Sequence, residues 1–249
     1  MIKTLDNYAK EDWLLANTHN GLAHDTDIYR IFRVDHLYND LIRNINTLVN
    51  PCYETQSDDL ENPLKDAKFD FEGNKHQLFR GLMAEYYTQS WSLNPIEWGH
   101  FGEGFDVIRV QAKAGKLFDR LMDDKDPFHS LVYHMGLIKY EDTNQIYDKI
   151  SNAPYYKFLD SRGYGLLNSV LKIRADFQKE EEVRLLYIRS PRKNYTEPQK
   201  HRVLGKQNQF CSHLFEWRNV IEYFELDPNN KGSGDSIITA IRNLSSNQD

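Results

Sequence analysis

Residues 177–190 of the chain read FQKEEEVRLLYIRS, with three consecutive glutamates placed directly before an apolar run. The run predicts a buried strand, because it is short, rich in branched and aromatic residues, and bounded by polar ones. Side chains alternate between the two faces of a strand. We therefore expect Glu180 and Glu182 to project from one face, roughly 7 Å apart. The opposite, core-facing side would carry Val183, Leu185 and Tyr187.

Two acids on one strand face have two interpretations. The first is a charged strand end that keeps the protein soluble and discourages pairing between sheet edges. The second is a pair of carboxylates that perform acid–base or electrostatic chemistry. Residues elsewhere in the chain favour the second interpretation.

The composition excludes several classes of protein. The 249 residues carry a net charge of −6, and 40% of them are hydrophobic. We expect a folded chain with a sizeable core and no overall positive field to attract nucleic acid. No apolar run reaches the roughly 18 residues of a membrane span, and the N-terminal residues lack a signal-peptide pattern. We therefore expect a cytoplasmic protein without a membrane partner, in which Cys52 and Cys211 are free thiols.

The order of the segments predicts an α+β protein. Strands are expected at residues 28–32, 76–82, 85–94, 105–112, 130–140, 181–188 and 215–228. Helices are expected at residues 37–48, 115–124, 144–150, 166–177 and 235–246. No linker-like composition divides the chain. The expected organisation is a polar, loosely packed arm over residues 1–27 and one domain over residues 28–249.

Two of the earlier strands carry groups that suit a dinucleotide. In HQLFRGL, Arg80 stands beside Gly81. A planar guanidinium next to a residue without a side chain can grip a pyrophosphate. In YYTQSWSLNP, Thr88, Ser90 and Ser92 alternate with larger residues and form a hydroxyl-bearing face that suits a ribose. Each pattern alone is also typical of an ordinary half-exposed strand.

An arginine strand, a serine strand and a glutamate strand in this chain order resemble the Arg-Ser-Glu branch of the ADP-ribosyltransferases. Arg80 matches the family's arginine, Ser90 and Ser92 match its Ser-x-Ser step, and Glu180 and Glu182 match its E-x-E motif. The resemblance implies a single domain with a mostly antiparallel, split ADP-ribosyltransferase-like β-core flanked by short helices. It also implies NAD as a co-substrate and no metal.

A second resemblance covers more of the chain, from about Ile28 to past Ile188. The segments QSWSLNP, FGEGFDVIRVQAKAGKLFDRL and EEEVRLLYI look like those of an uncharacterised bacterial domain family of about this length. The name of that family carries no function.

The transferase resemblance implies a role for each matched residue. Glu182 would bind the 2′-hydroxyl of the nicotinamide ribose and stabilise the positive charge that develops there. Nicotinamide leaves as a neutral molecule, so no general acid is needed, unlike in ordinary glycoside hydrolysis. Glu180 would orient or deprotonate the nucleophile. The NAD-binding residues would be Arg80, Gly81, Ser90, Ser92, Trp98 and Phe101, the last two by stacking on a ring.

The acceptor is suggested by the basic segment RSPRKNYTEPQKHRVLGK, which follows the glutamate strand. Arg189, Arg192 and Lys193 would hold the phosphates of RNA or DNA, with RNA favoured, and Tyr195 would stack on a base. A solvated loop is the equally favoured alternative. Similar transferases include toxins of toxin–antitoxin and anti-phage systems, which adds an antitoxin protein as an expected partner. Two further hypotheses are a protein-directed (arginine) transferase and a non-catalytic nucleic-acid-binding module.

Overall fold

The structure of the protein is a computed structural model that describes twelve stretches of the chain. They are residues 7–50, 69–71, 74–76, 86–98, 105–121, 133–142, 144–145, 148–149, 164–188, 202–204, 210–230 and 234–246.

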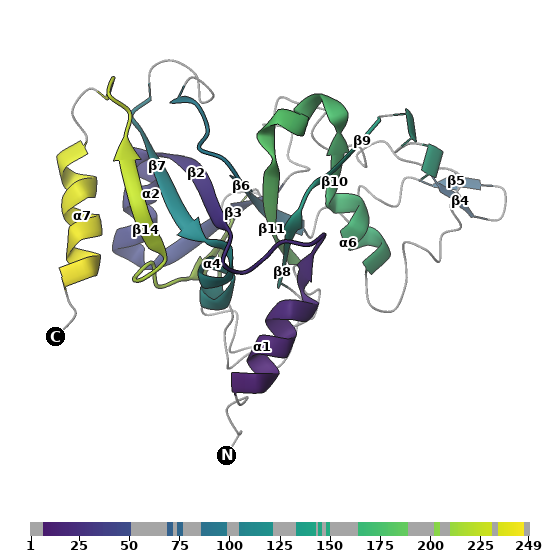
Figure 1. Cartoon of the computed structure of the whole chain (residues 1–249), viewed down its shortest axis with the longest axis horizontal. Coiled ribbons are helices and arrows are strands. Elements are labelled where there is room, and N and C mark those ends of the chain that lie inside the picture. Colours follow the sequence, from purple (N-terminus) through teal and green to yellow (C-terminus); the bar gives the residue numbers. More distant parts are fainter. Residues whose placement is uncertain are drawn as a thin grey trace.

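A ten-stranded, mostly antiparallel sheet forms the centre of the described chain (Figure 1). Its main path runs β1-β8-β11-β6-β2-β7-β14, and a branch of β3, β13 and β12 leaves it at β6. The strands of this sheet are β1 (Thr18–His19), β2 (Asp27–Arg33), β3 (Ile45–Val49), β6 (Tyr86–Ser92), β7 (Val107–Lys113), β8 (Tyr133–Leu137), β11 (Glu182–Ile188), β12 (Arg202–Leu204), β13 (Phe210–Leu214) and β14 (Ile221–Leu226). Two small sheets pair β4 (Phe69–Phe71) with β5 (Asn74–His76) and β9 (Lys139–Glu141) with β10 (Lys172–Arg174).

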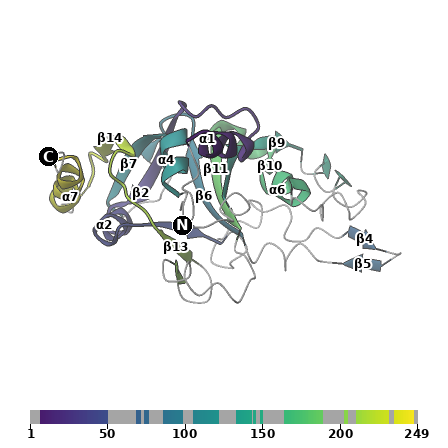
Figure 2. The ribbon, with the colours of Figure 1, turned by 90° about the horizontal axis from the view of Figure 1, so that it is seen from below.

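Short helices surround the sheet, as expected for an α+β protein. They are α1 (Asn7–Ala16), α2 (Val34–Arg43), α4 (Ala114–Leu121), α6 (Tyr164–Val170), the 3₁₀ helix η4 (Ala175–Glu180) and α7 (Gly234–Ser246). Helices α2 and α7 pack together at the β14 end, and α6 lies beyond β11 and β8 towards the other end (Figure 2). The described elements form one compact domain in which the sheet branches at β6. Among the described residues, no helix has the length and apolarity needed to span a membrane.

The core lies where the apolar face of the strands meets the apolar stripes of the helices. On β11 it includes Val183, Leu185 and Tyr187, as the alternation of that strand predicts. Helix α4 contributes Leu117, Phe118 and Leu121 at helical spacing, all of them buried. Burial of such a stripe stabilises a surface helix far more than its intrinsic propensity does. The pattern of the sequence thus correctly predicts the strands at residues 28–32, 85–94 and 105–112 and the helix that begins near residue 115.

Two expected helices are wrong in part. Over residues 37–48, the helix ends at Arg43 because Asn44 adopts a left-handed conformation, with φ 49° and ψ 54°. Such a residue commonly ends a helix, and asparagine tolerates it better than most side chains. The remaining residues form β3 instead. Over residues 166–177, α6 ends at Val170, and the chain then pairs with β9 as β10 before it turns into η4.

The N-terminal segment is packed rather than loose. Leu14 and Leu22 belong to the core, and β1 pairs in parallel with β8. The side-chain amide of Asn17 donates to the carbonyl of Tyr133 at 2.9 Å. Gly136 of β8 lets β1 come close, because a Cβ at that position would lie only 2.8 Å from the Cβ of His19. The expectation of a loosely packed arm is therefore wrong around Leu14 and Leu22, which are buried in the core, although Leu15 between them is exposed.

Candidate functional site

The candidate site lies where the central sheet branches at β6. Along one edge, β6 pairs with β11 over its whole length, from Ser92 opposite Glu182 to Tyr86 opposite Ile188. Among the described residues, its other edge pairs with β2 at a single position and with β3 at a single position. Ser90 lies between those two positions. The edge of β6 at Ser90 therefore faces the split between β2 and β3.

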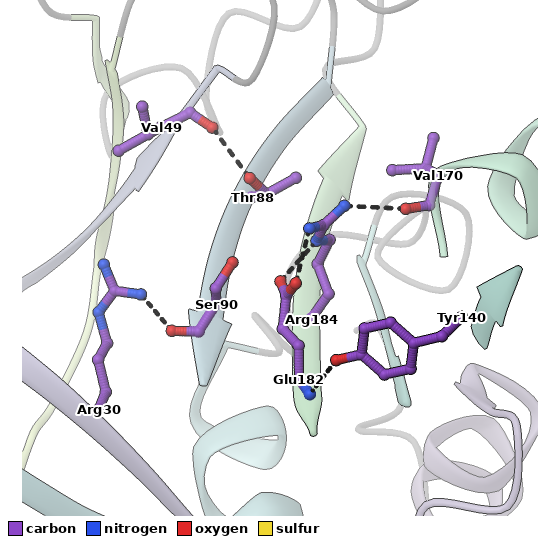
Figure 3. A network of polar contacts seen from close by, with 8 residues as sticks. All are labelled: Arg30, Val49, Thr88, Ser90, Tyr140, Val170, Glu182 and Arg184. Carbon is purple, nitrogen blue, oxygen red and sulfur yellow. Dashed lines mark hydrogen bonds and ion pairs between the residues drawn. The ribbon is translucent and has the colours of Figure 1, made fainter. Parts of the chain in front are cut away.

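An arginine of β2 reaches into this split. The Nη1 group of Arg30 donates a hydrogen bond to the carbonyl oxygen of Ser90 (Figure 3). Its guanidinium also lies over the ring of Phe32, with 5.0 Å to the centroid. The Nε atom of Arg30 is buried and has no hydrogen-bond partner among the described residues. The side chain thus has donors to spare at the edge of the serine strand.

The electrostatic surroundings of Arg30 include two acids. Burial lowers the pKa of Arg30 to about 10, while the nearby charges of Glu182 and Asp40 act in the opposite direction. A guanidinium with this pKa stays protonated at neutral pH. Burial also raises the pKa of Asp40 to about 6, against the hydrogen bonds that its carboxylate accepts from Thr47.

The serine strand and the glutamate strand present their polar side chains on one face. In an antiparallel pair, residues directly opposite each other share a face of the sheet. Ser92 is opposite Glu182, and Ser90 is opposite Arg184. Ser90 is exposed, whereas Ser92 is buried, and its hydroxyl donates to the carbonyl of Glu180 at 2.7 Å. Of the two serines, Ser90 is the one that presents an exposed side chain.

Glu182 is buried, and hydrogen bonds hold both its carboxylate and its backbone N–H. Its side chain is 5% exposed and that of its partner Arg184 is 10% exposed. Both carboxylate oxygens accept from the Arg184 fork, one from Nε and one from Nη2, each at 2.8 Å. The backbone N–H of Glu182 donates to the hydroxyl of Tyr140 at 2.7 Å. Figure 3 shows Glu182 and Arg184 on β11, with Ser90 on the adjacent strand β6 and Tyr140 on β9 of the small sheet.

The expectation that Glu180 and Glu182 project from one strand is wrong. Glu180 ends the 3₁₀ helix η4, and Glu181 has a positive φ of 44°, so the strand begins only at Glu182. The left-handed residue is fixed from both sides, because the carbonyl of Glu181 accepts from the N–H of Leu93 at 3.0 Å and its side chain accepts from Asn94. Glu180 still lies near the site, because its charge, like that of Glu182, raises the pKa of Tyr140.

Tyr140 joins this group from β9. Burial raises the pKa of Tyr140 to about 12, and the charges of Glu182 and Glu180 act in the same direction. The hydroxyl therefore stays protonated at neutral pH. Neither Tyr140 nor Arg184 was expected in the site. Arg184 was available in the sequence as the next residue on the face of Glu182, but Tyr140 comes from a strand with no motif of its own.

The structure places the remaining expected site residues as follows. Trp98 lies under the guanidinium of Arg109, with 4.7 Å to the ring centroid, so one face of its ring is already covered. Arg80, Gly81, Phe101, Arg189, Arg192, Lys193 and Tyr195 lie outside the described residues. Arg30, which sequence reasoning missed, is the described arginine beside Ser90. The feature of the sequence that could have indicated Arg30 is its position in the middle of the otherwise apolar strand IYRIF.

Histidines and cysteine form polar pairs elsewhere in the sheet. The ring nitrogens of His19 and His134 lie 3.2 Å apart, and Cys211 carries a free thiol 3.3 Å from the ring of His213. Within the described ranges, no group of three or more metal-ligating side chains comes together.

Comparison of the chain with models of known protein families, with curated proteins and with solved structures found no match.

Proposed function

We propose that the protein is an NAD-dependent ADP-ribosyltransferase that modifies an intracellular macromolecule, with RNA favoured as the acceptor. One observation carries the proposal: β2, β6 and β11 are neighbours in the sheet, the guanidinium of Arg30 reaches the backbone carbonyl of Ser90, and the side chain of Ser90 shares a face of the sheet with Glu182. The three types of group are those that the family resemblance calls for, in the same chain order. Among the described residues, Arg30 is the arginine beside Ser90. The role expected for Arg80 stays a prediction.

The binding of NAD would use the spare donors of Arg30. A guanidinium has five N–H donors, and one hydrogen bond of Arg30 goes to the carbonyl of Ser90. Its other donors suit the pyrophosphate oxygens, and burial strengthens such a contact because the surroundings have a low dielectric constant. The hydroxyl of the exposed Ser90 would hydrogen-bond the nicotinamide ribose.

The reaction itself would centre on Glu182. The bond between nicotinamide and C1 of the ribose breaks, its electron pair leaves with neutral nicotinamide, and the ribose becomes an oxocarbenium-like cation. A fixed carboxylate stabilises this cation without reorganising as the charge develops. Ionised carboxylates have about four lone-pair sites, so the fork of Arg184 leaves room for a ribose hydroxyl. A nucleophilic oxygen or nitrogen of the acceptor then bonds to C1, and its proton leaves to Glu180 or to water.

The proposal is tested by incubating the protein with NAD labelled in the adenylate part. Total RNA, DNA and lysate protein are offered separately, and nicotinamide release is measured in parallel. We expect label in RNA with the wild type, none with Glu182→Gln, and reduced transfer with Glu182→Asp, which keeps the charge but shortens the side chain. Glu216→Gln, a change at an exposed glutamate, is the matched control and should retain full transfer.

The outcomes separate the alternatives. Label on protein arginine in place of RNA would keep the chemistry and replace the acceptor. A wild type that neither transfers label to any pool nor releases nicotinamide contradicts the proposal. Thermal melting of each variant shows whether a loss of transfer reflects the site or the fold.

A further inference from the structure

Arg184 lies beside the candidate site and makes several hydrogen bonds there, but it has no role in the proposed reaction so far. It follows Glu182 by two residues on β11, so the two side chains share a face of the sheet. Three of its N–H groups have partners: two bind the carboxylate oxygens of Glu182, and Nη1 donates to the carbonyl of Val170 at 3.0 Å. The guanidinium is thus fixed between the glutamate and the end of α6, as Figure 3 shows.

We propose that Arg184 is a positioning residue, which pairs with the buried carboxylate of Glu182 and aims it for catalysis through an anchor on α6. This inference rests on the proposed function. It assigns Arg184 to the glutamate rather than to the acceptor, although an arginine this close to an active site would otherwise be a natural acceptor-binding group.

The charge-holding part of this role follows from burial. A carboxylate that is taken out of water favours its neutral form unless a cation or hydrogen bonds compensate. A neutral acid could not stabilise an oxocarbenium-like ribose. Among the described residues, the charged or titratable groups around Glu182 include Arg184 on its own strand, Arg30 from β2, Tyr140 from β9 and Glu180 from the end of η4. Of these, Arg184 is the cation that touches the carboxylate.

The orientation of the Glu182 carboxylate depends on the third hydrogen bond of Arg184, the one to the carbonyl of Val170. A fork that bonds both carboxylate oxygens fixes the plane of the carboxylate, provided that the fork itself cannot rotate. The bond from Nη1 to Val170 prevents that rotation, because α6 is tied to the same region: the N–H of Lys139 donates to the carbonyl of Leu171 at 2.9 Å. The two carboxylate oxygens then present their remaining lone pairs in a fixed direction.

The test measures nicotinamide release against pH for Arg184→Met and Arg184→Lys. Methionine removes both charge and fork, so at pH 7 we expect kcat to fall about 100-fold, which is the scale for a misplaced catalytic group. The acid limb of the pH profile should also move to higher pH, since the unpaired carboxylate now protonates more readily. Lysine keeps a point charge without a fork, so the acid limb should stay near the wild type while kcat still falls. Arg33→Met, a change at a more exposed arginine, is the control and should leave kcat unchanged.

A second measurement does not need the enzyme to be active. Urea unfolding of Arg184→Met is followed between pH 5 and 8 and compared with the double variant Glu182→Gln/Arg184→Met. In the single variant the buried acid holds a proton that the unfolded chain releases, so stability should fall as pH rises. The double variant lacks this acid, so its slope should be smaller by the contribution of Glu182, while the contribution of Asp40 stays the same in both variants. If Arg184→Met does not fold, the fall in kcat expected for Arg184→Lys still tests the aiming role, and a wild-type kcat in that variant would overturn it.

The outcomes are distinguishable. An Arg184→Met protein with the wild-type pH profile would overturn the positioning role. A wild type that releases no nicotinamide would remove the proposed function and with it the catalytic purpose of the contact. In that case the stability comparison alone decides whether Arg184 holds the charge of Glu182: equal slopes for the single and double variants would refute it.

Discussion

The burial of His134 makes a quantitative prediction about acid stability. His134 is 4% exposed, and its Nδ1 lies 3.2 Å from Nε2 of His19, in the contact that ties β1 to β8. Burial, with a contribution from the His19 ring, lowers the pKa of His134 from 6.5 to about 3. When the pH is below 6.5, the pKa of His134 in the unfolded chain, the unfolded chain takes up a proton that the folded protein cannot. Stability is therefore lost as pH falls from 6.5 towards 3.

The size of the loss follows from this window. Each pKa unit corresponds to about 1.4 kcal/mol, so the free energy of unfolding should fall by about 2 kcal/mol between pH 7.5 and pH 5.0 from this residue alone. The assay is urea unfolding of the wild type and of His134→Gln at both pH values. The variant lacks the titrating ring, so the difference between the two proteins should shrink by about 2 kcal/mol at pH 5.0. His36→Gln, a change at an exposed histidine, is the control. If the wild type and His134→Gln lose equal stability on acidification, the reasoning about burial is refuted.

Two other predictions concern single residues of the fold. Asp40 has a pKa raised from 3.8 to about 6, so the folded state binds its proton more tightly than the unfolded state and stability falls as pH rises across that window. In urea unfolding, Asp40→Asn should reduce the change of the unfolding free energy with pH by about 3 kcal/mol. If stability depends on pH in the variant as it does in the wild type, the raised pKa of Asp40 is contradicted. Gly136→Ala places a methyl group 2.8 Å from the Cβ of His19 and 3.1 Å from its carbonyl oxygen. The strand β1 must then shift, so the free energy of unfolding should fall by about 1–3 kcal/mol, and a variant as stable as the wild type would show that β1 is not held there.

Much of the sheet can be predicted from local patterns. The alternation in EVRLLYI and YYTQSWS predicts both strands and the apolar face of each, because period-two patterning is a local property. It does not predict that most of the polar face is covered as well, with Glu182, Arg184 and Ser92 buried. The position of Trp91 on the core side of its strand follows in the same way, and its ring is 1% exposed. What such patterns do not contain is where a strand stops. Left-handed residues at Asn44 and Glu181 end the expected helix and delay the expected strand, and tertiary hydrogen bonds, such as that from Leu93 to Glu181, fix the second of these.

The candidate site was predictable only where its residues share a strand or a motif. Glu182 and the serine strand were found from their spacing. Arg30 was missed because its partner, Ser90, is 60 residues away in the chain, and only the order of β2, β6 and β11 brings them together. Strand alternation is enough to place Arg184 on the face of Glu182, but the anchor on Val170 depends on the packing of α6. Such long-range contacts are set by topology, which the one-dimensional pattern does not specify.

The central claim is that Arg30, Ser90 and Glu182 surround one dinucleotide. The most direct test is nicotinamide release from NAD by the wild type, Arg30→Gln, Glu182→Gln and the control Arg33→Gln, which changes an arginine on the same strand. The account predicts release by the wild type and Arg33→Gln and its loss in the other two variants. Release by Arg30→Gln at the wild-type rate, or no release by the wild type, would contradict it.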